Sequence, residues 1–114
     1  MKLVSTTIEV VDRKKRKIAE MPKELRTKIE KEIQFFRNVN RFFDKLQNTD
    51  LSSEDKNIFR EYTNKLFQNY ETNKRKTIVY DVEKNKRMEI LQFEFVKKIS
   101  KDISITYEVM LREV

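Results

Sequence analysis

The sequence of 114 residues contains no glycine, no cysteine and no histidine. Phosphate-binding loops, G-x-G-x-x-G dinucleotide turns and G-x-S-x-G nucleophile elbows all need glycine, because a Cβ atom would prevent the close approach of backbone and ligand. Structural zinc, iron–sulfur and haem sites need cysteine or histidine, as do Ser-His and Cys-His nucleophile pairs. The composition excludes these classes of site, and we expect no metal and no cofactor.

Long apolar runs are missing as well. The uninterrupted apolar runs are pairs and triples, whereas a membrane-spanning helix needs about 20 residues. The first eleven residues include Ser5, Thr6, Thr7 and Glu9, where a signal peptide would have its apolar segment. The sequence therefore predicts a cytoplasmic protein that makes no membrane contact.

Positive charge is abundant. Lys and Arg number 26 against 19 Asp and Glu, which gives a formal net charge of +7 and a pI near 9.6. Such a balance favours nucleic acid, an anionic membrane surface or an acidic protein as a partner. Eight Phe and four Tyr indicate a folded chain rather than a disordered tail, and the length predicts one compact domain over residues 1–114.

Two helices are predicted in the first two thirds of the chain. Pro22 stands just before a 3.6-residue pattern, where its missing N–H costs nothing, and the pattern predicts a helix over 22–48. Its apolar stripe is Leu25, Ile29, Ile33, Phe36, Val39, Phe43 and Leu46. Ser52, with an acidic residue three positions later, predicts the N-cap of a second helix over 53–71. The short connection favours an antiparallel helical hairpin.

Four strands complete the predicted fold. Residues 3–11 alternate with period two, and the same period returns from residue 76 onward, with turns at 84–87 and 97–102. The alternating apolar residues are Val4, Ile8 and Val10, then Ile78, Tyr80 and Val82, then Leu91, Phe93 and Phe95, and finally Ile103, Ile105, Tyr107, Val109 and Leu111. Short turns make the last three strands an antiparallel meander.

The order is therefore β-α-α-β-β-β, an α+β fold in which the helical hairpin packs on one face of a four-stranded, mainly antiparallel sheet. An alternative for the segment after the first strand is a second short strand over residues 17–20. That strand would form an N-terminal β-hairpin with the first.

Two groups of cations are candidate nucleic-acid-binding residues. The first is the run Arg13, Lys14, Lys15, Arg16 and Lys17, which would attract phosphates by counterion release or would simply be a solvated loop. The second follows from the meander, because reversal of strand direction places the start of one strand beside the end of the next. This argument brings Lys74, Arg75 and Lys76 to the same sheet end as Lys97, Lys98 and Lys101. Basic turn residues also protect sheet edges from aggregation.

Paired phenylalanines widen the apolar face of the first helix. Phe35 and Phe42 share one angular position, and Phe36 and Phe43 share another about 100° away. Either the second helix covers Phe35 and Phe42, or these two rings form an interface with a partner or a second copy of the chain.

The element order resembles that of the RelE/ParE-type toxins, in topology and in size. The resemblance implies a small ribonuclease that works without histidine, with Lys98, Tyr107 and Arg112 as the residues that would carry the reaction, beside Arg75 and Lys76. Strand parity argues against such a site, because Tyr107 belongs to the apolar set whereas Arg112 falls on the opposite face.

These observations favour a small, non-enzymatic and dimeric nucleic-acid-binding protein of an accessory or regulatory kind. It would contact the backbone phosphates of DNA or RNA through its Lys- and Arg-rich turns. One alternative is an interaction or inhibitor module whose charge directs it to an acidic protein. The toxin-like ribonuclease is the other alternative.

Overall fold

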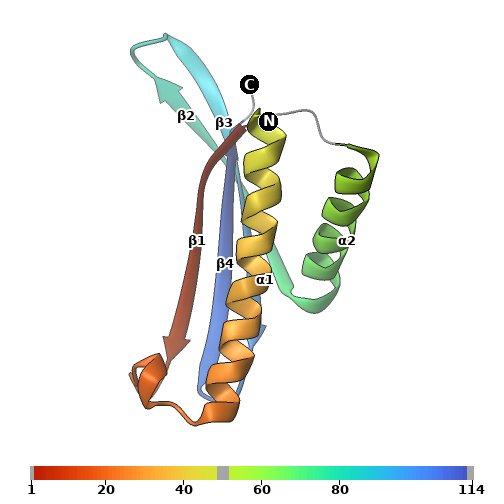
Figure 1. Ribbon diagram of the computed structural model, residues 1–114. Coiled ribbons are helices and arrows are strands. Elements are labelled where there is room, and N and C mark those ends of the chain that lie inside the picture. Colours follow the sequence, from red (N-terminus) through yellow and green to blue (C-terminus); the bar gives the residue numbers. More distant parts are fainter. Residues whose placement is uncertain (1, 49–51, 113–114) are drawn as a thin grey trace.

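The computed structural model describes residues 2–48 and 52–112, and it has the predicted element order (Figure 1). The elements are β1 (Lys2–Asp12), the short 3-10 helix η1 (Ile18–Glu20), α1 (Lys23–Asn48), α2 (Ser53–Asn69), β2 (Glu71–Asp81), β3 (Lys86–Lys98) and β4 (Ile103–Arg112). The strands form one sheet of order β1-β4-β3-β2, and each neighbouring pair is antiparallel. The α+β fold with two helices over a four-stranded sheet is confirmed.

Local signals in the sequence set the helix starts. The carbonyl of Pro22 accepts the backbone N–H of Arg26 at 3.1 Å, so the proline lies immediately before α1. The Ser52 hydroxyl accepts the backbone N–H of Asp55 at 3.1 Å, which confirms the predicted N-cap of α2. The side chain of Leu46 and the whole of residues 49–51 lie outside the described part of the chain.

The core lies between the helices and the sheet. Alternate residues of the central strand β4, namely Ile103, Ile105, Tyr107 and Val109, are almost fully buried. Phe36 and Val39 of α1 pack on the last three of these, together with residues of α2 and β3 that include Leu66 and Phe95, whereas Ile103 packs with Met21 and Ile29. Burial alternates along most of β4, because one face of an antiparallel sheet meets the helices and the other faces water.

The two helices meet through aromatic rings, which answers the question about Phe35 and Phe42. Phe35 lies 5.6 Å from Tyr62 and 6.1 Å from Tyr70, between ring centroids. Phe42 lies 5.5 Å from Tyr62 and 6.1 Å from Phe59. The interpretation in which α2 covers these rings is confirmed. Because α2 occupies this surface, the alternative of a partner interface at Phe35 and Phe42 was wrong.

Strand β1 corrects one predicted core residue. Its register with β4 shifts between Leu3 and Ser5, so Leu3 packs against the core whereas Val4 is 51% exposed. A bulge of this kind moves every residue beyond it to the other face. The alternation in the sequence could not reveal the shift, because Leu3 and Val4 are both apolar.

The alternative of a second short strand was wrong, and so was the expectation that the apolar residues of β2 lie on a buried face. Residues 17–20 do not form a strand, because Ile18–Glu20 is a 3-10 turn held by the Lys17 carbonyl and the Glu20 side chain. Val82 is 81% exposed and lies in the turn after β2. Ile78 and Tyr80 are each 54% exposed, since the β2–β3 hairpin extends past the helices (Figure 1).

Candidate nucleic-acid interface

A cluster of cations forms where β1 ends and β4 begins. The backbone N–H of Arg13 donates to the carbonyl of Asp102 at 2.9 Å, which joins the basic loop after β1 to the turn between β3 and β4. Arg13, Lys98 and Lys101 therefore line one hollow of about 270 Å³, together with Asp102 and Ser104. The sequence named all three cations but treated Arg13 as part of a separate group.

The loop that carries Arg13 is held by one carboxylate. Asp12 accepts the backbone N–H of Lys14 at 3.0 Å and the side-chain Nε–H of Arg16 at 2.9 Å. The hydrogen bond from Arg16 keeps the pKa of Asp12 below its ordinary value, with smaller contributions from the backbone N–H groups. Lys15 completes the turn with a φ of 54°. Arg16 is thus an internal anchor of the loop.

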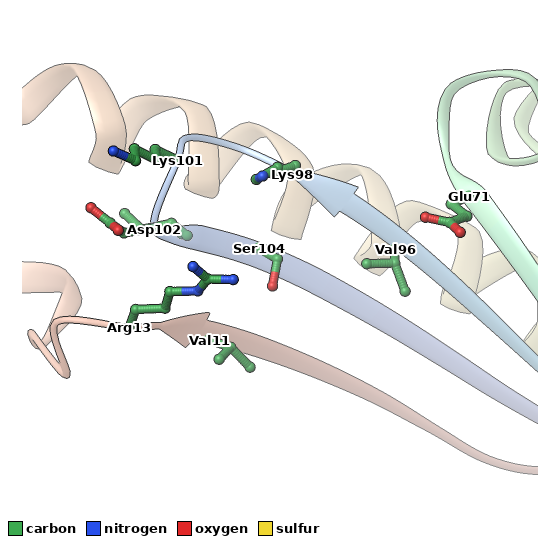
Figure 2. Close-up of a pocket in the computed structure, with 9 residues that line it drawn as sticks. Val11, Arg13, Glu71, Val96, Lys98, Lys101, Asp102 and Ser104 are labelled. Carbon is green, nitrogen blue, oxygen red and sulfur yellow. The ribbon is translucent and has the colours of Figure 1, made fainter.

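Figure 2 shows how the side chains of this hollow lie. The guanidinium of Arg13 is directed toward Ser104, and the ammonium of Lys98 lies on the far side of that serine, at the end of β3. The carboxylate of Asp102 and the ammonium of Lys101 extend away from Arg13, and Lys14 approaches Asp102 to 3.7 Å. Within residues 2–48 and 52–112 neither Arg13 nor Lys98 forms an ion pair, although Glu71 and Asp102 line the same hollow.

A second hollow of about 280 Å³ continues around the end of β3 to the helical side. Lys28 and Lys31 of α1 line it together with Lys97 and Lys98. Since Lys98 lines both hollows, they form one basic tract. We call Arg13, Lys28, Lys31, Lys98 and Lys101 the basic end. None of these five has an ion-pair partner among residues 2–48 and 52–112.

Lys97 belongs to the same region but has a structural role. Its Nζ lies 2.7 Å from Glu32 Oε1 and 5.4 Å from the centre of the Tyr70 ring. The Tyr70 hydroxyl donates to the other oxygen of Glu32. These contacts tie α1 to β3 and to the end of α2, and they leave the charge of Lys97 neutralised.

The predicted gathering of six cations at one sheet end was wrong. Strand β2 begins at Glu71, so Lys74 lies opposite Phe93 and Lys76 opposite Leu91. Lys97 is four residues further along β3, which is about 13 Å at the rise of a strand. The reason is that β2 extends through its polar first half, where the sequence has no apolar alternation to mark it.

The three cations of β2 also point to different faces. Lys74 lies over the Phe93 ring at 5.7 Å, and Lys76 pairs with Glu89 at 3.0 Å. Arg75 faces the open side, in a polar hollow with Asn73, Gln92 and Glu94. Whether any of them binds nucleic acid stays a prediction.

Sequence reasoning missed Lys28 and Lys31. The signal was present, because two lysines three residues apart share one face of a helix. Their closeness to Lys98 depends on how α1 crosses the sheet, and this crossing is set by packing of Ile29 with Met21 and Ile103.

The side chains named for a ribonuclease lie apart. Tyr107 is fully buried, and its hydroxyl donates to the side-chain oxygen of Asn40. Burial, with the nearby Asp44 carboxylate as a smaller cause, raises the pKa of Tyr107 far above its ordinary value. Arg112 pairs with Ile90 on the open face, whereas Lys98 lies at the other end of β3. The predicted separation of Tyr107 and Arg112 is confirmed.

No protein-family model, curated protein or solved structure matches the chain. Among the described residues no helix is both long and apolar enough to span a membrane. The part of the chain that the structure describes also has no group of three acidic side chains arranged to hold a metal ion.

Proposed function

We propose that the basic end binds the phosphate backbone of a nucleic acid, in an accessory or regulatory protein. The observation that supports this function is the convergence of five cations without ion-pair partners in the described residues. They come from the loop after β1, the first half of α1 and the turn between β3 and β4. When such cations bind a phosphate chain, they release the counterions condensed on it, and this release favours binding.

The side chains around the basic end favour backbone contact over base recognition. Besides lysine and arginine, the two hollows are lined by the carboxylates Glu32, Glu71 and Asp102 and by Ser104 and aliphatic side chains, and no aromatic ring is among their lining residues. Base stacking in single-strand binders requires exposed aromatic rings. We therefore expect binding that depends on phosphate spacing and salt but hardly on base sequence.

A binding titration tests this function. Duplex DNA, single-stranded DNA and structured RNA of equal length are each titrated at about 50 and 200 mM salt. If each of the five cations neutralises one phosphate, affinity for duplex DNA falls by roughly 10²- to 10³-fold between these concentrations. Scrambling the base sequence leaves it unchanged. Absence of binding to all three polymers at the lower salt concentration rejects the function.

A further inference from the structure

The outer edge of β2 is open. In the sheet order β1-β4-β3-β2, β2 pairs with β3 alone, and this register runs from Glu71 to Asp81 without a bulge. Such an edge presents a row of unpaired backbone N–H and C=O groups to another strand. The opposite edge differs, because the shift between Leu3 and Ser5 in β1 disturbs the flat geometry that strand addition needs.

Apolar side chains lie along the outer half of this open edge. Ile78 and Tyr80 are each 54% exposed, and Val79 is 38% exposed. The β2–β3 hairpin projects beyond both helices (Figure 1), so the helical layer leaves these residues uncovered. A further strand beside β2 would bury them and would pair the backbone groups at the same time.

The charges of β2 indicate which strand fits. Arg75 lies near the middle of β2 and Asp81 at its end, so an antiparallel partner needs an acid and a base with the same separation. A second copy of β2 has this arrangement. A two-fold axis perpendicular to the sheet pairs residues of the same face, and an axis through Ile78 places Arg75 of each copy opposite Asp81 of the other.

The same register brings apolar and neutral residues together. Ile78 would face its own copy, and Thr77 would face Val79. An axis through Lys76 would instead place that lysine opposite itself and Glu71 opposite Asp81, and like charges in directly opposed positions are destabilising. The charge pattern therefore favours the register centred on Ile78 over the one centred on Lys76.

Arg75 and Asp81 are both available for this pairing. The carboxylate of Asp81 accepts the backbone N–H groups of Glu83 at 3.1 Å and Lys84 at 3.3 Å through Oδ1, which fixes it at the end of the strand. Within residues 2–48 and 52–112, neither Arg75 nor Asp81 has an ion-pair partner.

We infer that β2 pairs antiparallel with the β2 strand of a second copy of this chain, in the register centred on Ile78. The two four-stranded sheets then become one continuous sheet, with the helices of both copies on the same face. This interface does not involve the basic end, so it can form whether or not the proposed nucleic-acid binding occurs.

Sedimentation equilibrium of the full chain tests the inference. The unmodified protein should have a mass of twice 14.0 kDa at about 100 µM, which is a concentration at which even micromolar dimers are formed. Arg75→Glu and Asp81→Lys should each weaken association by at least about tenfold, because each places like charges opposite each other. The double variant Arg75→Glu/Asp81→Lys should restore it to within about threefold.

Arg60→Glu is the matched control, because it makes the same charge change on an exposed residue of α2 and should leave the mass unchanged. Circular dichroism verifies that each variant is folded. A monomeric unmodified protein overturns the inference. That result would leave the edge of β2 to a strand of another protein instead of a second copy. A dimer that both single variants leave intact overturns it as well, and so does failure of the folded double variant to recover.

Discussion

The ring of Tyr107 stacks on the ring of Phe36, with their centroids 4.6 Å apart and their planes at 11°. Phe36 is the buried centre of α1 and Tyr107 the buried centre of β4, so this contact joins the two layers of the fold. Asn40, one turn after Phe36, accepts the Tyr107 hydroxyl. The tyrosine that a ribonuclease would have needed at its surface is instead a core residue whose polar atom is satisfied within the protein.

Truncation of this stack should be among the most destabilising single changes. Phe36→Ala is expected to lower the free energy of unfolding by about 3 to 5 kcal/mol, the usual range for buried aromatic truncations. Phe67→Ala is the control, because Phe67 is 53% exposed and should cost less than about 1 kcal/mol. Urea denaturation measures both, and equal losses would contradict the packing described above.

Removal of the Tyr107 hydroxyl should leave the oxygen of Asn40 unpaired. Tyr107→Phe is expected to cost about 1 to 2 kcal/mol in urea denaturation. Tyr80→Phe provides the comparison, since it removes a hydroxyl bonded to Asn85 at the exposed end of the hairpin, and we expect no measurable loss. A neutral effect at Tyr107 would show that its hydrogen bond contributes nothing.

The raised pKa of Tyr107 predicts a dependence of stability on alkaline pH. The folded state holds the phenolic proton more tightly than the unfolded state, whose pKa is near the ordinary 10.0. The resulting stabilisation is complete below pH 10 and is lost as the pH rises above it toward the folded value. The free energy of unfolding of Tyr107→Phe should therefore fall less steeply above pH 10 than that of the unmodified protein. Parallel curves would contradict the shift.

The sequence predicted the elements better than it predicted their lengths. Both helices and all four strands are present because Pro22, Ser52 and the apolar periods mark them locally. The first half of β2 carries no such signal, because Lys74, Arg75 and Lys76 are polar on both faces and are in a strand only through pairing with β3. The basic end was predicted only in part, because Lys28 and Lys31 join it through the packing of α1 on the sheet.

Each half of the basic end follows from a different level of information. Arg13, Lys98 and Lys101 stand in or beside predicted turns, so sequence alone could name them. Their meeting depends on the pairing of β1 with β4 across the chain, and the contribution of Lys28 depends on where α1 crosses the sheet. Only tertiary packing determines these relationships.

Neighbouring lysines provide a test of structural against binding roles. Lys97→Ala should lower stability by about 1 kcal/mol, because it breaks a partly exposed ion pair with Glu32, and should leave the salt dependence of nucleic-acid binding unchanged. Lys98→Ala should have the opposite effects, with unchanged stability and a slope lower by roughly one unit. Thermal denaturation and binding titrations separate the two, and identical behaviour would contradict the assignment.

The salt dependence of DNA binding in three triple variants decides where phosphates bind. The first variant, Arg13→Ala/Lys98→Ala/Lys101→Ala, removes three cations of the basic end. The second, Lys74→Ala/Arg75→Ala/Lys76→Ala, removes the cations of β2. The third, Lys56→Ala/Arg60→Ala/Lys65→Ala, removes three exposed cations of α2 and matches the change in net charge.

Phosphate binding at the basic end predicts that the slope of log affinity against log salt falls by roughly three units in the first variant, about one for each lost contact. The α2 variant should keep the slope of the unmodified protein. A first variant that is folded and retains the full slope, or that loses no more than the α2 variant, would contradict the proposed function.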